Sequence, residues 1–478
     1  MFLKSNILKA LPALLSLACV LNVHAVTERP NVLMIPMDDL SDYVSVLQNH
    51  PGIHTPNMDR LARTAVNFTH AFTAAPVCQS SRSAVVSGLA PDKTGVYHLP
   101  DSMSTSPALK DATPLAAQFR RHGYNTFLTG KYYHGLPVSW WPPALIEEMW
   151  TERKPPFSDH GPFLDEGRLI VDSTVYRIGP APDGIDSMPD TQSLEHTREW
   201  LSRDHKKPFL LVQGINKPHL AFVVPQEFFD LHPLEQIVLP EVLTDDWEDI
   251  PAAARAIFGE VDTEHFQKIR ASEEDWKRVV QSYLASISYS DWVLGQILDA
   301  LEASPYADNT VIVLWSDHGY HMGEKEKLHK QALWSQTCRV PFLISLPDLK
   351  MAGRQCAAPV SLLDIYPTLN DLCGLEQPVT QLLDGHSLVP LLENVEADWK
   401  HVVVTSHLPG NAAVSDARYR YIRYADGSEE LYDDQMDPRE YNNLINKAEF
   451  RQTADRLAKH IPTEWAPMSR TFEQQEVP

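Results

Sequence analysis

The chain has 478 residues, which is too long for one small domain and enough for a large α/β core with an appended piece. It carries 63 acidic against 41 basic residues, a formal net charge of −22, and this balance argues against non-specific binding of nucleic acid. An anionic substrate would therefore need a local basic pocket. Five cysteines are too few for a scaffold built on disulfides.

The N-terminus has the features of a secretory signal peptide. Two lysines precede an apolar run over residues 10–21, and residues 23–25 fit the small-residue cleavage rule. We expect residues 1–25 to be removed, the mature chain to start near Val26 and the protein to be periplasmic or secreted. The run is too short to span a bilayer, and no later segment is apolar enough to do so. Cys19 leaves lipoprotein processing open as an alternative.

The first expected strand ends in two carboxylates. Asn31 to Pro36 is a short apolar run that predicts a buried strand. Asp38 and Asp39 follow it, and adjacent carboxylates at a strand end suit a hard cation with oxygen ligands. Taken alone, the same pair fits a helix N-cap better. Residues 67–72 predict another strand.

A cysteine then lies between a proline-marked loop and a short predicted helix. Cys78 follows Ala75-Pro76-Val77, and Gly88 closes the helix. A helix N-terminus offers unpaired N–H groups and a positive dipole end, and Arg82, one turn later, reaches the same place. The pattern predicts an anion-binding pocket around Cys78. A buried small side chain, or half of a disulfide, is the alternative for an isolated cysteine.

A strand over residues 124–128 is expected to lead into a glycine-bounded loop that carries Lys131 and His134. Residues 137–189 are rich in Pro, Trp and Asp with little periodicity, which predicts surface loops that shape a substrate pocket. A helix over residues 190–203 comes next.

The strand after that helix, residues 208–214, runs into Lys217-Pro218-His219. Residues 231–270 are acidic and are expected to be irregular. The apolar stripe over residues 276–301 predicts a long amphipathic helix.

A last strand of this kind, residues 309–315, delivers Asp317 and His318, and Lys330 follows. Beyond about residue 396, short β-like runs and a final helix predict a small separate sheet.

Four of the expected strands end in polar residues of similar character. Because ligands bind outside the carboxyl ends of the strands in open, mostly parallel sheets, we expect these residues to form one site.

Cys78-x-Ser80-x-Arg82 resembles the activation motif of the type I sulfatases, in which the cysteine is oxidised after translation to formylglycine. The Asp-Asp pair, the Gly-Lys loop with its histidine, Lys-Pro-His, Asp-His-Gly and the later lysine match this family in order over nearly the whole mature chain. Ser80 stands where the family usually has Pro or Ala, and Leu89 ends a segment that is usually Thr-Gly-Arg-like. The Lys131-x-x-His134 spacing, and a histidine after Asp317 where many sulfatases have Asn, are most similar to the iduronate-2-sulfatase-like branch of the alkaline phosphatase superfamily.

The resemblance implies an α/β fold with a large, mostly parallel mixed sheet flanked by helices, as in alkaline phosphatase. This catalytic domain would span residues 26–395, and a smaller antiparallel β/α subdomain would span residues 396–478. The implied reaction is hydrolysis of sulfate esters, most simply on a poly- or oligosaccharide such as a glycosaminoglycan or the algal polysaccharide ulvan. A formylglycine-generating or equivalent maturation enzyme is an implied partner.

The resemblance also implies a metal site and a sulfate pocket. One calcium ion would be held by Asp38, Asp39, Asp317 and His318, with formylglycine-78 beside it. The residues lining the sulfate pocket would be Arg82, Lys131, His134, His219 and Lys330. The cation and the basic side chains would neutralise the sulfate oxygens, and the hydrated aldehyde would supply the nucleophile. His219, with Lys330, would give a proton to the leaving alcohol, and His134 would take one from the hydrate.

Two other readings remain open. A phosphate or phosphonate ester hydrolase of the same superfamily is the nearest alternative, although its two-zinc members need a second His and Asp cluster that the sequence does not reveal. An inactive glycan-binding protein with the sulfatase fold is the other, and the intact Cys78, Arg82 and ligand set argue against it. Once Cys78 is oxidised, Cys338, Cys356 and Cys373 allow at most one disulfide.

Overall fold

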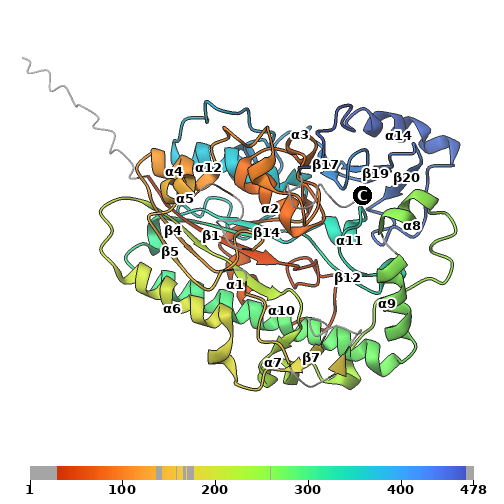
Figure 1. Cartoon of the computed structure of the whole chain (residues 1–478), viewed down its shortest axis with the longest axis horizontal. Coiled ribbons are helices and arrows are strands. Elements are labelled where there is room, and N and C mark those ends of the chain that lie inside the picture. The colour runs from red at the N-terminus through yellow and green to blue at the C-terminus, as the bar shows by residue number, and fades with distance from the viewer. Residues whose placement is uncertain are drawn as a thin grey trace, which may run out of the picture.

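A central nine-stranded sheet organises the protein (Figure 1). The computed structural model describes residues 29–135, 141, 143–157, 159–164, 168–169, 177–258 and 260–469, so the expected signal peptide lies outside the described residues. The strand order is β15-β2-β14-β11-β1-β8-β4-β5, with β9 beside β1. These strands are β1 (Asn31–Asp38), β2 (Ala65–Phe68), β4 (Asn125–Thr129), β5 (Glu152–Lys154), β8 (Phe209–Gln213), β9 (Ile215–Pro218), β11 (Thr310–Ser316), β14 (Phe342–Ser345) and β15 (Gln355–Cys356).

The large sheet is mostly parallel, as the sequence predicts. β1 runs parallel to β8, β9 and β11, β4 runs parallel to β5 and β8, and β15 runs parallel to β2. Only β14 reverses the direction within this sheet, since it is antiparallel to both β11 and β2. The carboxyl ends of β1, β4, β8 and β11 therefore meet at one edge.

Helices cover both faces of the sheet, which explains the continuous apolar character of β1. Leu33 and Ile35 pack into one buried cluster, and Val32 and Met34 into another on the opposite face. Figure 1 shows α6 and α10 on one side and α2, α4 and α12 on the other. The first face is covered by α1 (Pro56–Ala62), α6 (Pro189–Ser202), α7 (Gln226–Asp230), α9 (Glu260–Arg270) and α10 (Glu273–Glu302), and the second by α2 (Cys78–Ser87), α4 (Leu115–Arg121), α5 (Pro143–Met149), α12 (Ile365–Cys373) and α13 (Val389–Glu393).

Two expectations about irregular segments are wrong. Residues 231–270 contain α8 (Ala252–Phe258) and α9, because a narrow apolar stripe is buried there: Phe266 and Ile269 are core residues, and the Phe266 ring meets Trp276 edge-on at 5.2 Å. Residues 137–189 are not only loops, since α5 packs on the core and β5 extends the main sheet. Tertiary burial outweighed composition in both segments.

A separate antiparallel sheet follows towards the C-terminus, in agreement with the expected smaller subdomain. It consists of β17 (Val403–Ser406), β18 (Ala412–Ser415), β19 (Tyr419–Arg423) and β20 (Glu429–Asp433), and α14 (Arg451–Ala458) shares a core with it. The domain boundary after residue 395 stays a prediction. The remaining short elements are α3 (Pro91–Thr94), α11 (Ser335–Cys338), β3 (Ala71–Phe72), β6 (Arg168–Leu169), β7 (Arg177–Pro180), β10 (Val223–Val224), β12 (His321–Met322), β13 (Leu328–His329) and β16 (Val360–Ser361).

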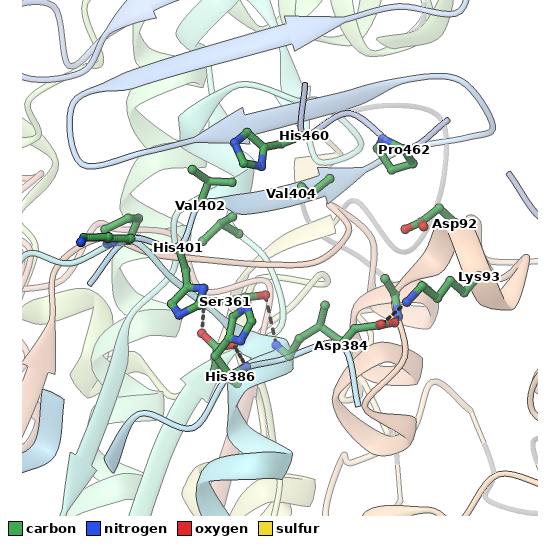
Figure 2. Close-up of a pocket in the computed structure, with 16 residues that line it drawn as sticks. Asp92, Lys93, Ser361, Asp384, His386, His401, Val402, Val404, His460 and Pro462 are labelled. Atoms are coloured by element: carbon green, nitrogen blue, oxygen red, sulfur yellow. Dashed lines mark hydrogen bonds and ion pairs between the residues drawn. The ribbon is translucent and has the colours of Figure 1, made fainter. Parts of the chain in front are cut away.

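A groove of about 380 Å³ lies along the seam between β17 and the main domain (Figure 2). His386 and His401 line it with their rings stacked 3.7 Å apart, and none of the predicted site residues contributes to it.

In the part of the chain that the structure describes, no helix is both long and apolar enough to cross a membrane. The four cysteines of this part are all free and buried.

Candidate active site

Cys78 is the first residue of α2. The residue before it, Val77, is extended with φ −155°, and the helix ends at Gly88, where φ is 69°. Gly88 also leaves space for Leu383, which a Cβ would approach to 2.5 Å. All ten residues of α2 are buried, so the chain places Cys78 at the positive end of a helix dipole inside the protein.

Strand register brings three carboxylates to Cys78. In the parallel pair β1–β11, Met37 lies opposite Ser316, so the residues that follow, Asp38 and Asp317, reach the same edge of the sheet. The backbone N–H of Asp39 donates to Asp317 Oδ1 at 3.1 Å, and the φ of Asp39 is 60°, which turns the chain there. All three carboxylates are buried.

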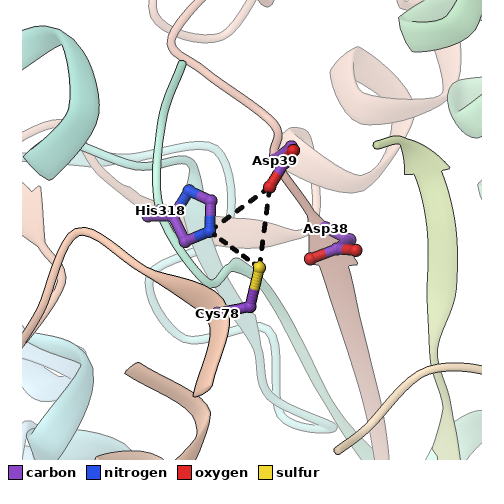
Figure 3. Close-up of side chains that lie close together, drawn as sticks. All are labelled: Asp38, Asp39, Cys78 and His318. Carbon is purple, nitrogen blue, oxygen red and sulfur yellow. Dashed lines mark hydrogen bonds and ion pairs between the residues drawn. The ribbon is translucent and has the colours of Figure 1, made fainter. Parts of the chain in front are cut away.

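The carboxylates, Cys78 and His318 form a group suited to a cation. Single ligand atoms of Asp38, Asp39, Cys78 and His318 all lie within 4.8 Å of one another (Figure 3). His318 Nδ1 faces the Gly319 carbonyl at 2.9 Å and must carry a proton there, so Nε2 is the nitrogen that a cation would meet once it has lost its own proton.

His318 Nε2 lies 3.3 Å from Asp39 Oδ1 and 3.2 Å from Cys78 Sγ. Asp317 Oδ1 lies 3.7 Å from the same nitrogen. A donor set in which carboxylates dominate fits calcium or magnesium better than zinc. The residues present therefore fit the ion that the resemblance implies.

Arg82 is fully buried and holds this group together. Its Nε donates to Asp317 Oδ2 at 2.8 Å, and one terminal nitrogen lies 3.3 Å from Asp38 Oδ1. The guanidinium also donates to the carbonyls of Met37, Lys131 and Tyr132. These five bonds use all five N–H groups. Arg82 thus orients the carboxylates and the Lys131 loop, and its place in the sulfate pocket stays a prediction.

Two lysines place positive charge beside Asp38, Asp39 and Cys78. Lys131 forms an ion pair with Asp38, and Lys330 Nζ lies 2.6 Å from Asp39 Oδ1 and 2.9 Å from Cys78 Sγ. Burial alone would raise the pKa of Cys78, but the charges of Lys330, His318 and Lys131 hold that pKa well below its usual range. Negative charge at position 78 is therefore stabilised.

Burial and neighbouring positive charges also oppose each other at the carboxylate group. Burial would raise the pKa of Asp38, and the charges of Lys131, His219 and Arg82 keep that pKa well below its usual value. Three buried cations face three carboxylates, so an added divalent ion would leave a surplus of positive charge for an anionic substrate.

His219 and His134 lie on the rim of this cluster. His219 Nδ1 donates to the Leu220 carbonyl at 2.6 Å, which directs Nε2 to a point 3.7 Å from Asp39 Oδ2. The side chain of His219 is 19% exposed against 1% for Asp39, so His219 marks the open side of the site. His134 forms a hydrogen bond with Cys78 that contributes to lowering the thiol pKa.

His160 is a site residue that sequence reasoning missed. Its ring stacks on His219 with centroids 4.0 Å apart and planes inclined by 20°, and ligand atoms of Asp38, His160 and His219 lie within 4.8 Å of one another. This is the second His and Asp cluster that the sequence did not reveal. Imidazole lone pairs lie in the ring plane, so two nearly parallel rings do not direct theirs at one ion in this arrangement, which disfavours a second metal there. No motif marks His160 within the aperiodic segment 137–189.

The structure brings all the residues predicted for the site to one edge of the sheet: Asp38, Asp39, Cys78, Arg82, Lys131, His134, His219, Asp317, His318 and Lys330. Their individual roles stay predictions. A sheet that gathers buried carboxylates, cations and histidines around one nucleophile position has the layout of a hydrolase of anionic esters.

Comparison with known families agrees with this layout. Residues 30–375 match the family model described as Sulfatase, and residues 323–465 match the C-terminal model of N-sulphoglucosamine sulphohydrolase. The chain therefore belongs to the sulfatase family, within the alkaline phosphatase superfamily. It is a sulfuric ester hydrolase.

Several named relatives are similar over most of their length. A sulfatase of Formosa agariphila is 37% identical, over 92% of this chain and 88% of that protein. An ulvan-active sulfatase of the same organism is 28% identical, over 94% and 83% of the two chains. Human iduronate 2-sulfatase is 29% identical, over 74% and 71%. The crystal structure of a phosphonate monoester hydrolase of Agrobacterium radiobacter matches with a TM-score of 0.70 and 24% identity, over 90% of this chain and 94% of that one, and shows the same fold.

Proposed function

We propose that this sulfatase hydrolyses sulfate esters of a sulfated poly- or oligosaccharide, with formylglycine derived from Cys78 and one calcium ion. The observation that carries the proposal is the position of Cys78, at the N-terminus of a buried helix, 2.9 Å from Lys330 Nζ and beside the carboxylate group. The names of the relatives suggest ulvan or a saccharide that contains sulfated iduronate as the substrate.

The calcium ion would be held by Asp38, Asp39, Asp317 and His318, and residue 78 would complete the site. When bound, the ion and the aldehyde hydrate supply electrostatic stabilisation and a nucleophile at the sulfur. Lys131 and Lys330 would hold the sulfate oxygens, since each ammonium keeps donors beyond the contacts described above.

Two histidines would move the protons. The leaving alcohol of a sugar needs a proton, and His219 Nε2 is on the open side, where that alcohol departs. His219 acts as the acid in its doubly protonated form, because its Nδ1 proton is committed to the Leu220 carbonyl. His134, in contact with residue 78, would take the proton from the nucleophile.

Export through residues 1–25, to the periplasm or the outside, and activation by a formylglycine-generating or equivalent enzyme complete the proposal. Cys78 is fully buried, and so is the whole of α2. The maturation enzyme would therefore have to reach the Cys78 peptide before α2 packs into the core.

Mass spectrometry of the peptide that contains residue 78 tests the nucleophile. The expected result is a mass loss that corresponds to conversion of the thiol to an aldehyde. Partial conversion in a foreign host is expected because Ser80 replaces the commoner Pro. Full activity with an unmodified thiol would overturn the formylglycine proposal.

Two measurements distinguish a sulfatase from a phosphate or phosphonate ester hydrolase. They are the relative turnover of 4-nitrophenyl sulfate and 4-nitrophenyl phosphate, and the metal content of the protein. The alternative of a phosphate or phosphonate ester hydrolase is kept because such an enzyme shares the fold. Preference for the sulfate and one calcium per chain support our proposal, whereas two zinc ions per chain and preference for the phosphate would overturn it. A panel of heparin-derived disaccharides and ulvan oligosaccharides then identifies the saccharide.

A further inference from the structure

His160 is built into the open side of the active site by its backbone. The buried ammonium of Lys217 donates to the carbonyls of His160 at 3.1 Å, of His219 at 3.3 Å and of Ala221. One side chain thus ties the segment of His160 to the segment of His219. Lys217 is held in turn, because Asp190 accepts its backbone N–H at 3.0 Å.

The ring of His160 covers one face of His219 and offers an unused polar atom. The two rings stack with centroids 4.0 Å apart. His160 Nδ1 is buried and has no hydrogen-bond partner among the described residues. A buried polar nitrogen without a partner costs free energy unless a bound group satisfies it. The near-parallel stack does not direct both rings at one metal ion, which leaves a water molecule or a hydroxyl group as a suitable partner for the imidazole.

The ring of His160 lies on the side of the site from which a substrate enters. The sulfate-binding cations are buried, whereas His219 is 19% exposed and His160 is intermediate in burial. A sulfate ester that enters the pocket therefore leaves its organic part on the side of His219 and His160. A sugar carries hydroxyl groups on the carbons next to the ester, and such a hydroxyl both donates and accepts hydrogen bonds.

We propose that His160 binds a hydroxyl of the sugar that carries the scissile sulfate, and so selects saccharide esters over simple aryl esters. The proposal rests on the proposed function and deepens it. His160 is assigned a substrate contact that is separate from proton transfer, which stays with His219.

The test is the selectivity of His160→Phe, which keeps an aromatic ring to stack on His219 but has no polar atom. The two probes are 4-nitrophenyl sulfate and the oligosaccharide that the wild type turns over fastest in the heparin and ulvan panel. Loss of one hydrogen bond from a site built for it should lower the ratio of the two kcat/KM values, saccharide over aryl, about tenfold. His386→Phe is the matched control, because His386 also stacks on a histidine but lies in the groove of Figure 2, and it should leave the ratio unchanged.

The outcomes are distinct. An unchanged ratio in His160→Phe, with both kcat/KM values equal to those of the wild type or both reduced alike, would overturn the proposal and leave His160 as packing for His219. A saccharide-specific loss in His160→Phe, with recovery in His160→Gln, supports it. If the wild type turns over the aryl sulfate but no saccharide of the panel, the saccharide assignment fails and this proposal fails with it.

Discussion

The proposed roles of His219 and His134 can be distinguished by changing the leaving group of the substrate. In the proposal only His219 gives a proton to the leaving group. A sugar alkoxide leaves badly without a proton, whereas a nitrophenolate hardly needs one. His219→Ala should therefore slow desulfation of a saccharide by about 10²–10⁴-fold and cost an aryl sulfate much less. His134→Ala should slow both, because its proton comes from the nucleophile and not from the alcohol.

The measurement is kcat/KM of both variants on both substrates. Equal losses for His219→Ala would remove it from the acid role and leave Lys330, which lies within reach of residue 78, as the candidate.

Metal removal is the second prediction at the scale of single residues. Dialysis against EDTA should abolish turnover and lower the melting temperature, because an ion that binds only the folded state stabilises it, by about 2.7 kcal/mol at one hundred times its Kd. Calcium should restore both better than magnesium, which demands a stricter octahedral geometry. His318→Ala should be less stable before EDTA and change less upon its addition. Unaltered activity in a protein shown to be free of metal would contradict the assignment.

The elements that carry the site were predictable to different degrees. The strands that lead to Asp38 and Asp317 and the helix that begins at Cys78 were identified because apolar runs, a proline loop and a closing glycine mark them. The helix α9 was missed because its apolar stripe is narrow and its composition acidic. His160 was missed because its place depends on a long-range contact, the bond from Lys217, which no local pattern encodes. The role of Arg82 also became visible only with its acceptors.

Close packing of two strand ends gives a prediction at the scale of elements. Gly214 follows β8, and a Cβ there would lie 1.9 Å from the carbonyl oxygen of Lys131, which follows β4. Gly214→Ala should push the Lys131 backbone away from the site. A shift of about 1 Å in a positioned group can cost about 10²-fold in rate, and we expect a loss of that order in kcat/KM with a lower melting temperature.

The control for this variant is Gly52→Ala. The nearest atom to a Cβ at Gly52 is 3.5 Å away, which is ordinary contact, so activity should be unchanged. Full activity of Gly214→Ala would show that the loop of Lys131 can shift without displacing the ammonium.

At the scale of the whole molecule, the C-terminal sheet of β17–β20 contacts the segment that follows Lys330. Arg420 on β19 is fully buried and donates twice to the Leu333 carbonyl, at 2.8 and 2.6 Å. Glu440 accepts the backbone N–H of Ser335 at 2.7 Å, and Glu430 on β20 accepts from Trp334 Nε1 at 2.9 Å. The residues just after Lys330 are thus anchored from the C-terminal side. The match of residues 323–465 to one C-terminal family model spans both parts of this contact.

Arg420→Met should therefore weaken both the fold and the active site. It leaves the buried Leu333 carbonyl without its donor and removes the cation that lies 3.5 Å from Glu440 Oε1, which should cost about 3 kcal/mol. It also frees the segment that positions Lys330. Arg418→Met is the control, just before β19. The Arg418 side chain is 48% exposed, so its ion pair with Asp433 is worth at most about 1 kcal/mol. Thermal unfolding and the KM for 4-nitrophenyl sulfate are the measurements. A lower melting temperature with an unchanged KM would mean that the sheet stabilises the protein without positioning Lys330.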